Sequence, residues 1–325
     1  MKTFLLSFVV AVFGLSAAAQ DTRTYVDGAG HSVEIPVQAQ RIVALRGEQF
    51  VAPLTELGAP IVGSSANLIE GVNNGEPVIR GAYDLFHTTF ADSGITFVGS
   101  HNQPDVETIA TLDADLILLP DFNAELYDQL SAVAPTVVIN IWSDTARDRY
   151  RNIADAVGRL DEFEQLQSVY DFRLNEARAL TEQMIGDPSE VSVVIAEVTG
   201  DRFRVYKNYG AMSSVLQELG FNTPEIIKTI DGDRLDLSPE QVQLIDADFM
   251  VTSYAEHFRA PPANIRANWD ALIPGWDQVL HAPRNNQHIL IAREPMRALS
   301  FRSMEEMLAI YLSNIVTRSF VPLED

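Results

Sequence analysis

The stretch LDADLILLPD (residues 112–121) occurs a second time, little changed, as IDADFMVTSY (residues 245–254). In each copy an acidic residue, Glu107 or Glu240, stands eight residues before the second aspartate of the Asp-Ala-Asp triplet. A helix-like stretch joins them, and an apolar run follows the triplet. Because the same order of helix, turn and strand occurs twice, the repetition predicts two lobes built on one plan.

The rest of the chain shows the same alternation of elements. A second pair of similar stretches, LTELGAP (residues 54–60) and LQELGFN (residues 216–222), also has one copy in each half of the chain. An alternating stretch around a Gly-rich turn, residues 25–36, predicts an opening hairpin. Short apolar runs between helix-period segments predict parallel sheets covered by helices. The expected strands are residues 42–45, 61–63, 95–98, 116–119, 137–139, 191–198, 203–206, 249–253 and 289–292, and the closing helix is residues 304–317.

Between the lobes, residues 143–185 mix charged and apolar residues at helical spacing without a proline. They predict one helix over about 145–157 and a long one over about 162–185. The expected fold class is α/β: two Rossmann-like lobes with central parallel sheets, joined by a single long interdomain α-helix. Two such lobes face each other across a cleft, where a ligand binds beyond the strand ends. The expected boundaries are a signal peptide over 1–19, an N-terminal lobe over 20–142, connecting helices over 143–186 and a C-terminal lobe over 187–325.

The first nineteen residues have the features of a secretory signal. Lys2 supplies a positive charge, residues 4–15 are apolar, and Ala17 to Ala19 form a small-residue cleavage site. The apolar stretch is too short for a membrane span. The chain contains no cysteine, which excludes disulfides, thiolate metal sites, cysteine nucleophiles and a lipid anchor on cysteine. We therefore expect cleavage after Ala19 and a soluble protein in the periplasm.

The composition limits the classes of partner that the protein can bind. The chain has 23 basic and 45 acidic residues, a formal charge of −22, and loss of Lys2 would leave −23. Such a surface repels nucleic acid and anionic lipid, so we expect neither nucleic-acid binding nor direct membrane insertion. The charge alone also fits a protein kept soluble by its surface. A mature chain of about 305 residues is longer than a domain with a single hydrophobic core usually is, so the length favours two domains.

Motifs of catalysis and of metal binding do not occur. There is no G-x-S-x-G elbow, no P-loop and no G-x-G-x-x-G after a strand, so we do not expect an enzyme. The six histidines form no H-x-x-H or H-E-x-x-H pair. Direct metal-ion binding would therefore need ligands assembled from distant parts of the chain, and it stays a less favoured alternative.

The sequence resembles a known family over essentially its whole mature length. DGAGHSVEIPVQAQRIVAL (residues 27–45) is similar to the opening signature of the periplasmic iron–siderophore and vitamin B12 binding proteins of ABC importers. ELGAPIVG (56–63), QPDVETIATLDADLILL (103–119) and LSPEQVQLIDADFMV (237–251) follow in family order. Ala39 replaces a usual proline, and residues 66–94 are longer than the typical loop. The resemblance implies the helical-backbone, class III type: two lobes, a rigid interdomain helix, a shallow cleft, no cofactor, and a monomer.

The resemblance also assigns the repeated acidic residues a role. In this family an acidic residue on each lobe docks onto arginines of the two permease subunits, and Glu107 and Glu240 occupy the matching positions. A pseudo-two-fold receptor then meets a two-fold transporter. The alternative is that a glutamate in a first helical turn merely helps to cap its helix.

The expected ligand is an anionic ferric siderophore, which saturates its own iron. Binding then needs cationic donors and aromatic walls rather than metal ligands. His101 stands where a relative that binds hydroxamates carries arginine. Haem or a cobalamin-type corrinoid would fit the same architecture, and each residue could instead be a surface ion pair or packed aromatic. The candidate ligand-binding residues lie at strand ends and in residues 66–94: Arg46, Arg80, Tyr83, His101, Trp142, Tyr206, Lys207, Tyr209, Arg234, Tyr254, Arg293 and Arg297.

Overall fold

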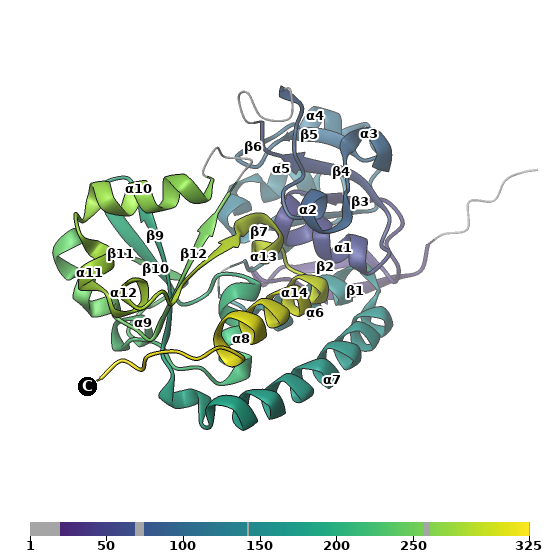
Figure 1. Cartoon of the computed structure of the whole chain (residues 1–325). Coiled ribbons are helices and arrows are strands. Elements are labelled where there is room, and N and C mark those ends of the chain that lie inside the picture. Colours follow the sequence, from purple (N-terminus) through teal and green to yellow (C-terminus); the bar gives the residue numbers. More distant parts are fainter. Residues whose placement is uncertain (1–19, 69–74, 142, 256–260, 325) are drawn as a thin grey trace, which may run out of the picture.

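The structure is a computed structural model that describes residues 20–68, 75–141, 143–255 and 261–324. Two separate sheets, each with helices packed on it, form an N-terminal and a C-terminal lobe (Figure 1). The expected signal peptide, residues 1–19, and the candidate Trp142 lie outside the described residues. Within those residues, none of the helices combines the length and apolarity needed to cross a membrane.

The chain opens with the expected antiparallel hairpin of β1 (Thr22–Val26) and β2 (Ser32–Pro36). Its turn is held by the buried Asp27, whose Oδ1 accepts from the amides of Ala29 and His31 at 3.0 and 2.8 Å. Asp27 Oδ2 accepts from the amide of Val138 at 3.0 Å. The Asp-Gly-Ala-Gly motif therefore anchors the hairpin to the first lobe, as a turn and not as a phosphate loop.

The N-terminal lobe is built on a six-stranded sheet in the order β6-β5-β4-β3-β7-β8. All neighbours are parallel except β6, which pairs antiparallel with β5. The apolar runs of the sequence became its central strands because both faces are covered by helices. The strands are β3 (Ile42–Ala44), β4 (Ile61–Ala66), β5 (Thr96–Ser100), β6 (Gln103–Pro104), β7 (Leu116–Pro120) and β8 (Thr136–Ile139).

The C-terminal lobe has a five-stranded sheet in the order β11-β10-β9-β12-β13. Here β9, β12 and β13 are parallel, as expected for the centre of the sheet, and β10 and β11 extend the sheet antiparallel on one side. A tight turn at Gly200, with φ of 64°, joins β9 directly to β10, and only antiparallel strands can be joined so closely. The strands are β9 (Val193–Thr199), β10 (Arg202–Tyr206), β11 (Arg234–Leu237), β12 (Phe249–Tyr254) and β13 (His288–Ala292).

The repeated Asp-Ala-Asp triplet has the same structural role in both lobes. Asp115 precedes β7, and its carboxylate accepts from the amides of Gln40 and Arg41 at 2.7 and 2.9 Å, where β3 begins. Asp248 precedes β12, and its carboxylate accepts from the amide and the hydroxyl of Ser192, both at 2.7 Å, where β9 begins. Each aspartate thus closes the amino end of the neighbouring parallel strand, and the prediction of two lobes on one plan is confirmed.

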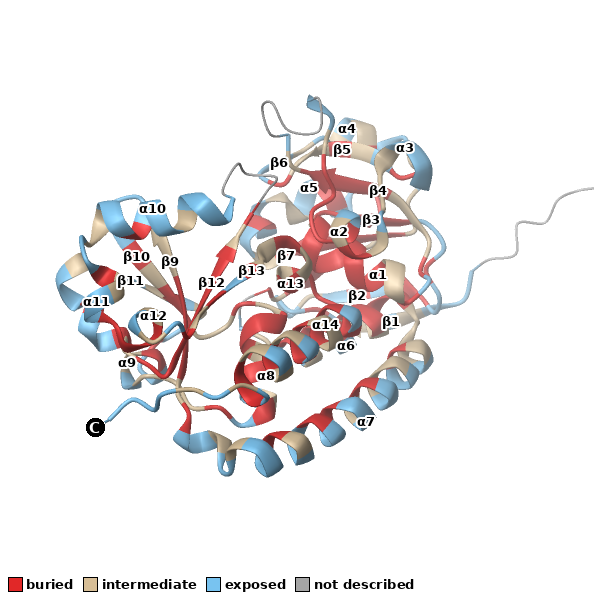
Figure 2. Ribbon diagram, in the orientation of Figure 1, coloured by how far each residue is buried: buried red, intermediate tan, exposed pale blue. Residues whose placement is uncertain are grey.

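Two helices connect the lobes. α6 (Ala146–Val157) ends at Gly158, and α7 (Leu160–Ile185) then runs along the outside of the molecule for about 39 Å (Figure 1). α7 begins two residues earlier than expected. Its buried residues recur at helical spacing on one face, while the other face is exposed, giving the striped pattern in Figure 2.

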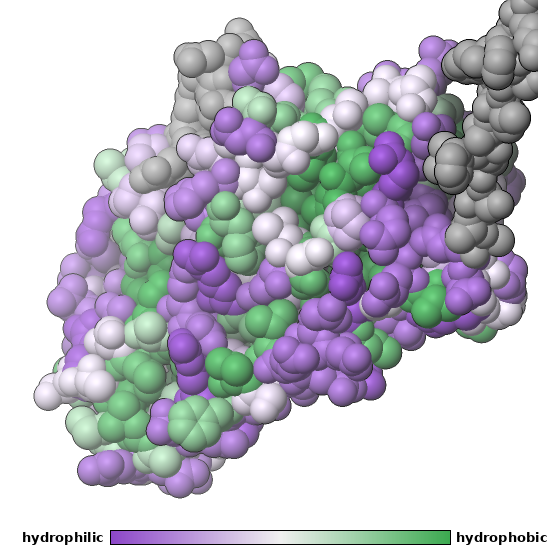
Figure 3. Space-filling model, turned by 90° about the vertical axis from the view of Figure 1, so that its right-hand side faces the viewer, coloured by the Kyte–Doolittle hydropathy of each residue, from purple (hydrophilic) through white to green (hydrophobic). Residues whose placement is uncertain are grey.

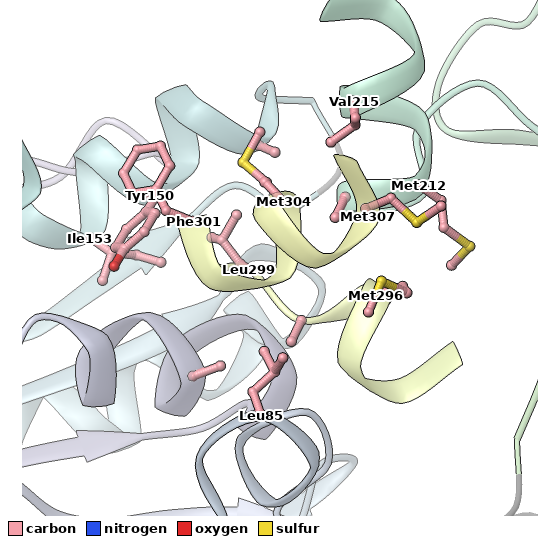
Figure 4. Packing of buried hydrophobic residues seen from close by; sticks show 14 of the residues in the cluster. Leu85, Tyr150, Ile153, Met212, Val215, Met296, Leu299, Phe301, Met304 and Met307 are labelled. Carbon is pink, nitrogen blue, oxygen red and sulfur yellow. The ribbon is translucent and has the colours of Figure 1, made fainter. Parts of the chain in front are cut away.

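The last helices of the chain pack against the first lobe. Phe301, at the start of α14 (Phe301–Tyr311), contacts the rings of Tyr150, Phe163 and Tyr170 with centroids 5.1 to 5.5 Å apart. Glu56 of α1 (Ala52–Glu56) accepts from the first amides of α14 at 2.9 and 2.8 Å. Figure 4 shows this cluster continuing through methionines of α8, α13 and α14. One core therefore joins both lobes, which fixes the cleft between them.

The remaining helices are short or lie at the periphery. Figure 3 shows one face of the molecule on which hydrophilic areas alternate with several hydrophobic ones. These elements are η1 (Gly47–Val51), α2 (Ala82–Phe86), α3 (Phe90–Ser93), α4 (Val106–Ala110), η3 (Asp121–Leu126), α5 (Tyr127–Ser131), η4 (Pro188–Glu190), α8 (Ala211–Leu219), α9 (Glu225–Lys228), η5 (Pro239–Ile245), α10 (Pro262–Leu272), α11 (Trp276–Val279), α12 (His281–Arg284), α13 (Arg293–Arg297) and η7 (Leu312–Val316).

Candidate ligand-binding cleft

A cavity of about 210 Å³ opens at the carboxyl end of β9 in the C-terminal lobe. Its walls come from β9, from β10 and from α13, the helix that follows β13. This is the edge of an open α/β sheet at which ligands bind. The lining includes five of the residues expected from the sequence, namely Tyr206, Tyr209, Arg234, Arg293 and Arg297.

Two stacked tyrosines form one wall of this cavity. The rings of Tyr206 and Tyr209 lie 3.9 Å apart and 4° from parallel, and both are buried. Their hydroxyls donate to Glu197, at 2.9 and 3.1 Å, and the hydroxyl of Ser253 donates to the same carboxylate. Burial raises the pKa of Tyr209 to about 12, so its phenol stays neutral. The wall therefore presents fixed aromatic faces.

A buried carboxylate organises the basic residues of the N-terminal lobe. Glu48 is fully buried just after β3, and Arg46 Nη2 lies 2.8 Å from its Oε1. Arg80 Nη1 and His101 Nε2 each lie 3.9 Å from its carboxylate oxygens. Burial alone would raise the pKa of Glu48, but the guanidinium groups of Arg46 and Arg80 hold it well below its usual range. The carboxylate is therefore ionised and gathers cations around itself.

His101 is the neutral member of this group. Burial lowers the pKa of its imidazole to about 4. Glu48 opposes this shift, and the neighbouring arginines add to it. Its Nδ1 lies 2.9 Å from the hydroxyl of Ser65. At neutral pH the ring contributes hydrogen bonding and no charge.

Arg80 links this group to the C-terminal lobe. Its Nε and Nη2 donate to the two oxygens of Glu294 in α13, at 2.7 and 3.1 Å. Arg293 Nε also donates to Glu294, at 3.0 Å. The next residue, Gly81, has φ of 74°, and a Cβ there would lie 2.8 Å from that of Ala298. Glycine therefore allows the two backbones to approach closely enough for the ion pair.

The assembled cleft is locally positive although the chain is strongly acidic. Four guanidinium groups, of Arg46, Arg80, Arg293 and Arg297, stand against the carboxylates of Glu48, Glu294 and Glu197, an excess of positive charge in a chain of net charge −22. Burial lowers the pKa of Arg46, and Arg297 and Arg80 add to that lowering, which places the cations within electrostatic reach of one another. Such a site favours an anion.

Other expected residues lie at the rim of the cavity or away from it. Tyr83 is exposed on α2, and Tyr254 is half-buried at the end of β12 without lining the cavity. Lys207 donates from Nζ to the carbonyl of Ile230 at 2.9 Å and lines a different cavity. Arg234 is exposed at the rim, with Nη1 3.3 Å from Asp233. Whether any of these residues contacts ligand stays a prediction.

The sequence did not single out Arg149. This arginine of α6 is buried, and its Nη1 donates to the carbonyl of Ile141. It lines a small space of about 20 Å³ that it shares with Tyr209 and Arg297. Burial lowers its pKa to about 10, a shift that Asp144 and Asp121 partly offset. The sequence did contain an indication of this burial, because Arg149 falls on the apolar face of the helix beside Tyr150 and Ile153.

Glu107 and Glu240 occupy matching places on the two lobes. Both are exposed in the first turn of a helix, Glu107 in α4 and Glu240 in η5. The α4 start is capped by Asp105, whose side chain accepts from Thr108 at 3.1 Å, and the η5 start is capped by Ser238. Asp105 and Gln241 accept capping hydrogen bonds at these two helix starts, and both glutamate carboxylates are exposed at the surface.

In the described part of the chain, histidines, aspartates and glutamates do not come together in any group of three that could hold a metal ion. His288 is packed against the edge of Trp276, and burial lowers its pKa to about 4. His281 Nε2 lies 2.7 Å from the carbonyl of Val321. His257 lies outside the described residues.

Two α/β lobes held by a connecting helix, with a basic cleft at the strand ends, define a two-lobed substrate-binding protein. Comparison with known sequences agrees: the profile of the periplasmic binding protein family matches residues 82–261, more than half of the chain. The chain belongs to this family, whose members bind substrates for transport and are not enzymes.

Individual relatives are similar over part of their length. A probable siderophore-binding lipoprotein of Bacillus subtilis is 29% identical over 236 residues, 69% of this chain and 68% of the relative. The achromobactin-binding periplasmic protein of Dickeya dadantii is 29% identical over 200 residues, 60% of this chain and 63% of the relative.

Solved structures confirm the fold. Staphylococcus aureus SirA in complex with staphyloferrin B superposes with a TM-score of 0.75, at 22% identity, covering 90% of this chain and 98% of SirA. Holo-ViuP gives a TM-score of 0.69 at 17% identity, covering 90% of this chain and 94% of ViuP.

Proposed function

We propose that this protein is the substrate-binding component of an ABC importer and that it captures an anionic ferric siderophore in the interlobe cleft. Family membership supports the transport role. The names of the relatives, which include siderophore-binding and achromobactin-binding proteins, support a ferric chelate as cargo. Delivery then takes place at a permease dimer in the inner membrane.

The observation that carries the choice of ligand charge is the arginine cluster around Glu48 and Glu294. Guanidinium groups form strong, directional hydrogen bonds with carboxylate and catecholate oxygens. The ion pairs with Glu48 and Glu294 bring guanidinium groups of both lobes close to one another, beside the cavity that Arg293 and Arg297 line. The stacked tyrosines supply a flat apolar wall for the organic part of a chelate.

A charge series of ferric complexes tests this proposal. Quenching of intrinsic fluorescence would be followed while ferric citrate, an anionic complex, and ferrioxamine B, a cationic one, are titrated separately. We expect the anionic complex to bind at least about tenfold more tightly, a difference of about 1.4 kcal/mol, and the difference to shrink at high salt. Equal affinity, or tighter binding of ferrioxamine B, would refute the choice of an anionic ligand.

The same proposal assigns Glu107 and Glu240 to permease docking. Each is an exposed carboxylate at a helix start, one on each lobe, so the pair suits a transporter with two equivalent basic sites. The domain boundaries inferred from the sequence, export to the periplasm and a monomeric state belong to this proposal as well.

A further inference from the structure

The distribution of lysine in this chain is unusual. The chain has three lysines among its 23 basic residues, and the others are arginines. Lys2 falls in the first nineteen residues, outside the described part of the chain. The two that remain, Lys207 and Lys228, line one and the same cavity.

This cavity, of about 250 Å³, lies between β9 and the helices α8 and α9. Its floor is apolar and comes from five buried side chains. These are Val193, Ile195, Leu216, Phe221 and Ile227. Tyr206 lines both this space and the cleft cavity, so the two are neighbours. An apolar floor offers water few hydrogen bonds. An apolar group that enters the cavity is stabilised because its own surface is removed from water.

The two lysines bring positive charge to the apolar floor. Lys207 is half-buried and uses one N–H in its bond to the carbonyl of Ile230 at 2.9 Å. Lys228 is exposed, with Nζ 2.5 Å from Glu225 Oε1. An ammonium group carries three donors on a flexible stem, so each lysine has further donors to offer a ligand. The polar side chains of Gln217 and Asn222 lie on the same lining.

We propose that this cavity is a second ligand site, for a small amphipathic anion with an apolar body and one carboxylate. The apolar floor would take the body, and Lys207 and Lys228 would bind the carboxylate. The volume corresponds to about eight water-sized groups, which matches a chain of about eight carbons. This inference does not rest on the proposed transport function, because it uses no residue of the arginine cluster.

Amine labelling reads the occupancy of the cavity directly. Mature protein would be acetylated with an N-hydroxysuccinimide ester, and the rates at Lys207 and Lys228 followed by peptide mass mapping. Octanoate at about ten times its Kd should slow both rates about tenfold by mass action. Acetate lacks the apolar body and 1-octanol lacks the charge, so neither should protect. No protection by octanoate, or equal protection by acetate, would overturn the proposal.

Substitutions test whether octanoate binds in this cavity or is attracted by positive charge elsewhere on the surface. Calorimetric titration should show octanoate binding weakened at least about tenfold in Lys207→Met/Lys228→Met, since both charge-assisted contacts are lost. Thr223→Trp, which would fill the cavity from its lining, should weaken it similarly. Arg151→Met/Arg266→Met removes two exposed positive charges elsewhere and should change affinity less than about twofold. Thermal unfolding would verify that each variant is folded.

Octanoate affinity measured on Arg293→Met/Arg297→Met distinguishes this cavity from the cleft. It should stay within about twofold of the wild type, because neither arginine lines this cavity. Octanoate binding that survives in Lys207→Met/Lys228→Met would place the anion elsewhere and refute the site.

Discussion

Arg80 of the N-terminal lobe and Glu294 of α13 are joined by two hydrogen bonds, although their positions in the chain differ by 214. Both side chains are buried. The two bonds tie Arg80 to α13, the helix that carries Arg293 and Arg297. The positions of the cationic groups in the cleft therefore depend on this pair.

Replacing Arg80 with methionine should destabilise the protein strongly. The change leaves Glu294 buried with Arg293 as its remaining described ion-pair partner, and loss of one partner of a buried pair costs about 3 kcal/mol or more. Chemical denaturation measures the difference in unfolding free energy. The exposed Arg151, replaced in the same way, provides the control and should cost less than about 1 kcal/mol. Equal effects of the two substitutions would show that Arg80 is not a structural link.

The repeated aspartates make a paired prediction. Asp115→Asn and Asp248→Asn each replace a carboxylate whose two oxygens both accept from backbone amides. These are the amides of Gln40 and Arg41 for Asp115, and of Ser192 and Leu323 for Asp248. An amide has one oxygen to accept with, so each change should cost about 2 kcal/mol of unfolding free energy. Asp201→Asn, at an exposed turn, should cost nothing measurable. A large loss at one repeat and none at the other would contradict the shared role.

Stability should fall as the pH is lowered below neutrality. His101 and His288 have folded-state pKa values of about 4, both lowered mainly by burial, against an ordinary value near 6.5. Between these values the unfolded chain binds protons that the folded chain does not, so unfolding free energy decreases as pH falls from about 6.5 towards 4.

Each histidine should account for about 2 kcal/mol of this loss at pH 5. His288→Gln removes one titrating group far from the arginine cluster, and its unfolding free energy should vary less between pH 7 and pH 5 than that of the wild type. Identical pH profiles for the two proteins would exclude His288 as a source.

The docking proposal predicts that loss of Glu107 and Glu240 impairs transport and leaves ligand binding unchanged. In Glu107→Ala/Glu240→Ala, ferric citrate affinity should match the wild type, because both residues are exposed and neither lines the cleft cavity. Uptake of radiolabelled iron by cells that depend on this protein should fall at least about tenfold, since both charged contacts with the permease are lost. Glu34→Ala/Glu190→Ala removes the same charge from other exposed sites and serves as the control. Normal uptake by the Glu107 and Glu240 variant would refute docking.

Much of the fold followed from the pattern of apolar residues. Every strand expected from the sequence exists, because runs such as residues 116–119 are covered on both faces and leave no alternative to a buried strand. β11 was missed because its sequence, RLDL, alternates charged and apolar residues over four positions at the sheet edge. Short helices such as α2 and α3 were missed because four or five residues are too few to show a helical period.

The site was harder to anticipate than the fold. The sequence analysis chose arginines because they are few in an acidic chain. Arg293 and Arg297 line the cavity, and Arg46 and Arg80 lie at Glu48. Their contact with a ligand stays a prediction. The carboxylates that organise them, Glu48 and Glu294, could not be chosen among 45 acidic residues, since their importance lies in burial across two lobes. Lys207 was assigned to the cleft from its place after β10, but its side chain lies on the neighbouring cavity.

The central claim is that the arginines of α13 bind an anionic ferric chelate. The direct measurement is the Kd for ferric citrate of wild-type protein and of Arg293→Met/Arg297→Met, with Arg151→Met/Arg266→Met as the charge-matched control. The account predicts a loss of at least about a hundredfold in the α13 variant, about 2.7 kcal/mol, and little change in the control. An α13 variant that is folded and binds ferric citrate as tightly as the wild type would contradict it.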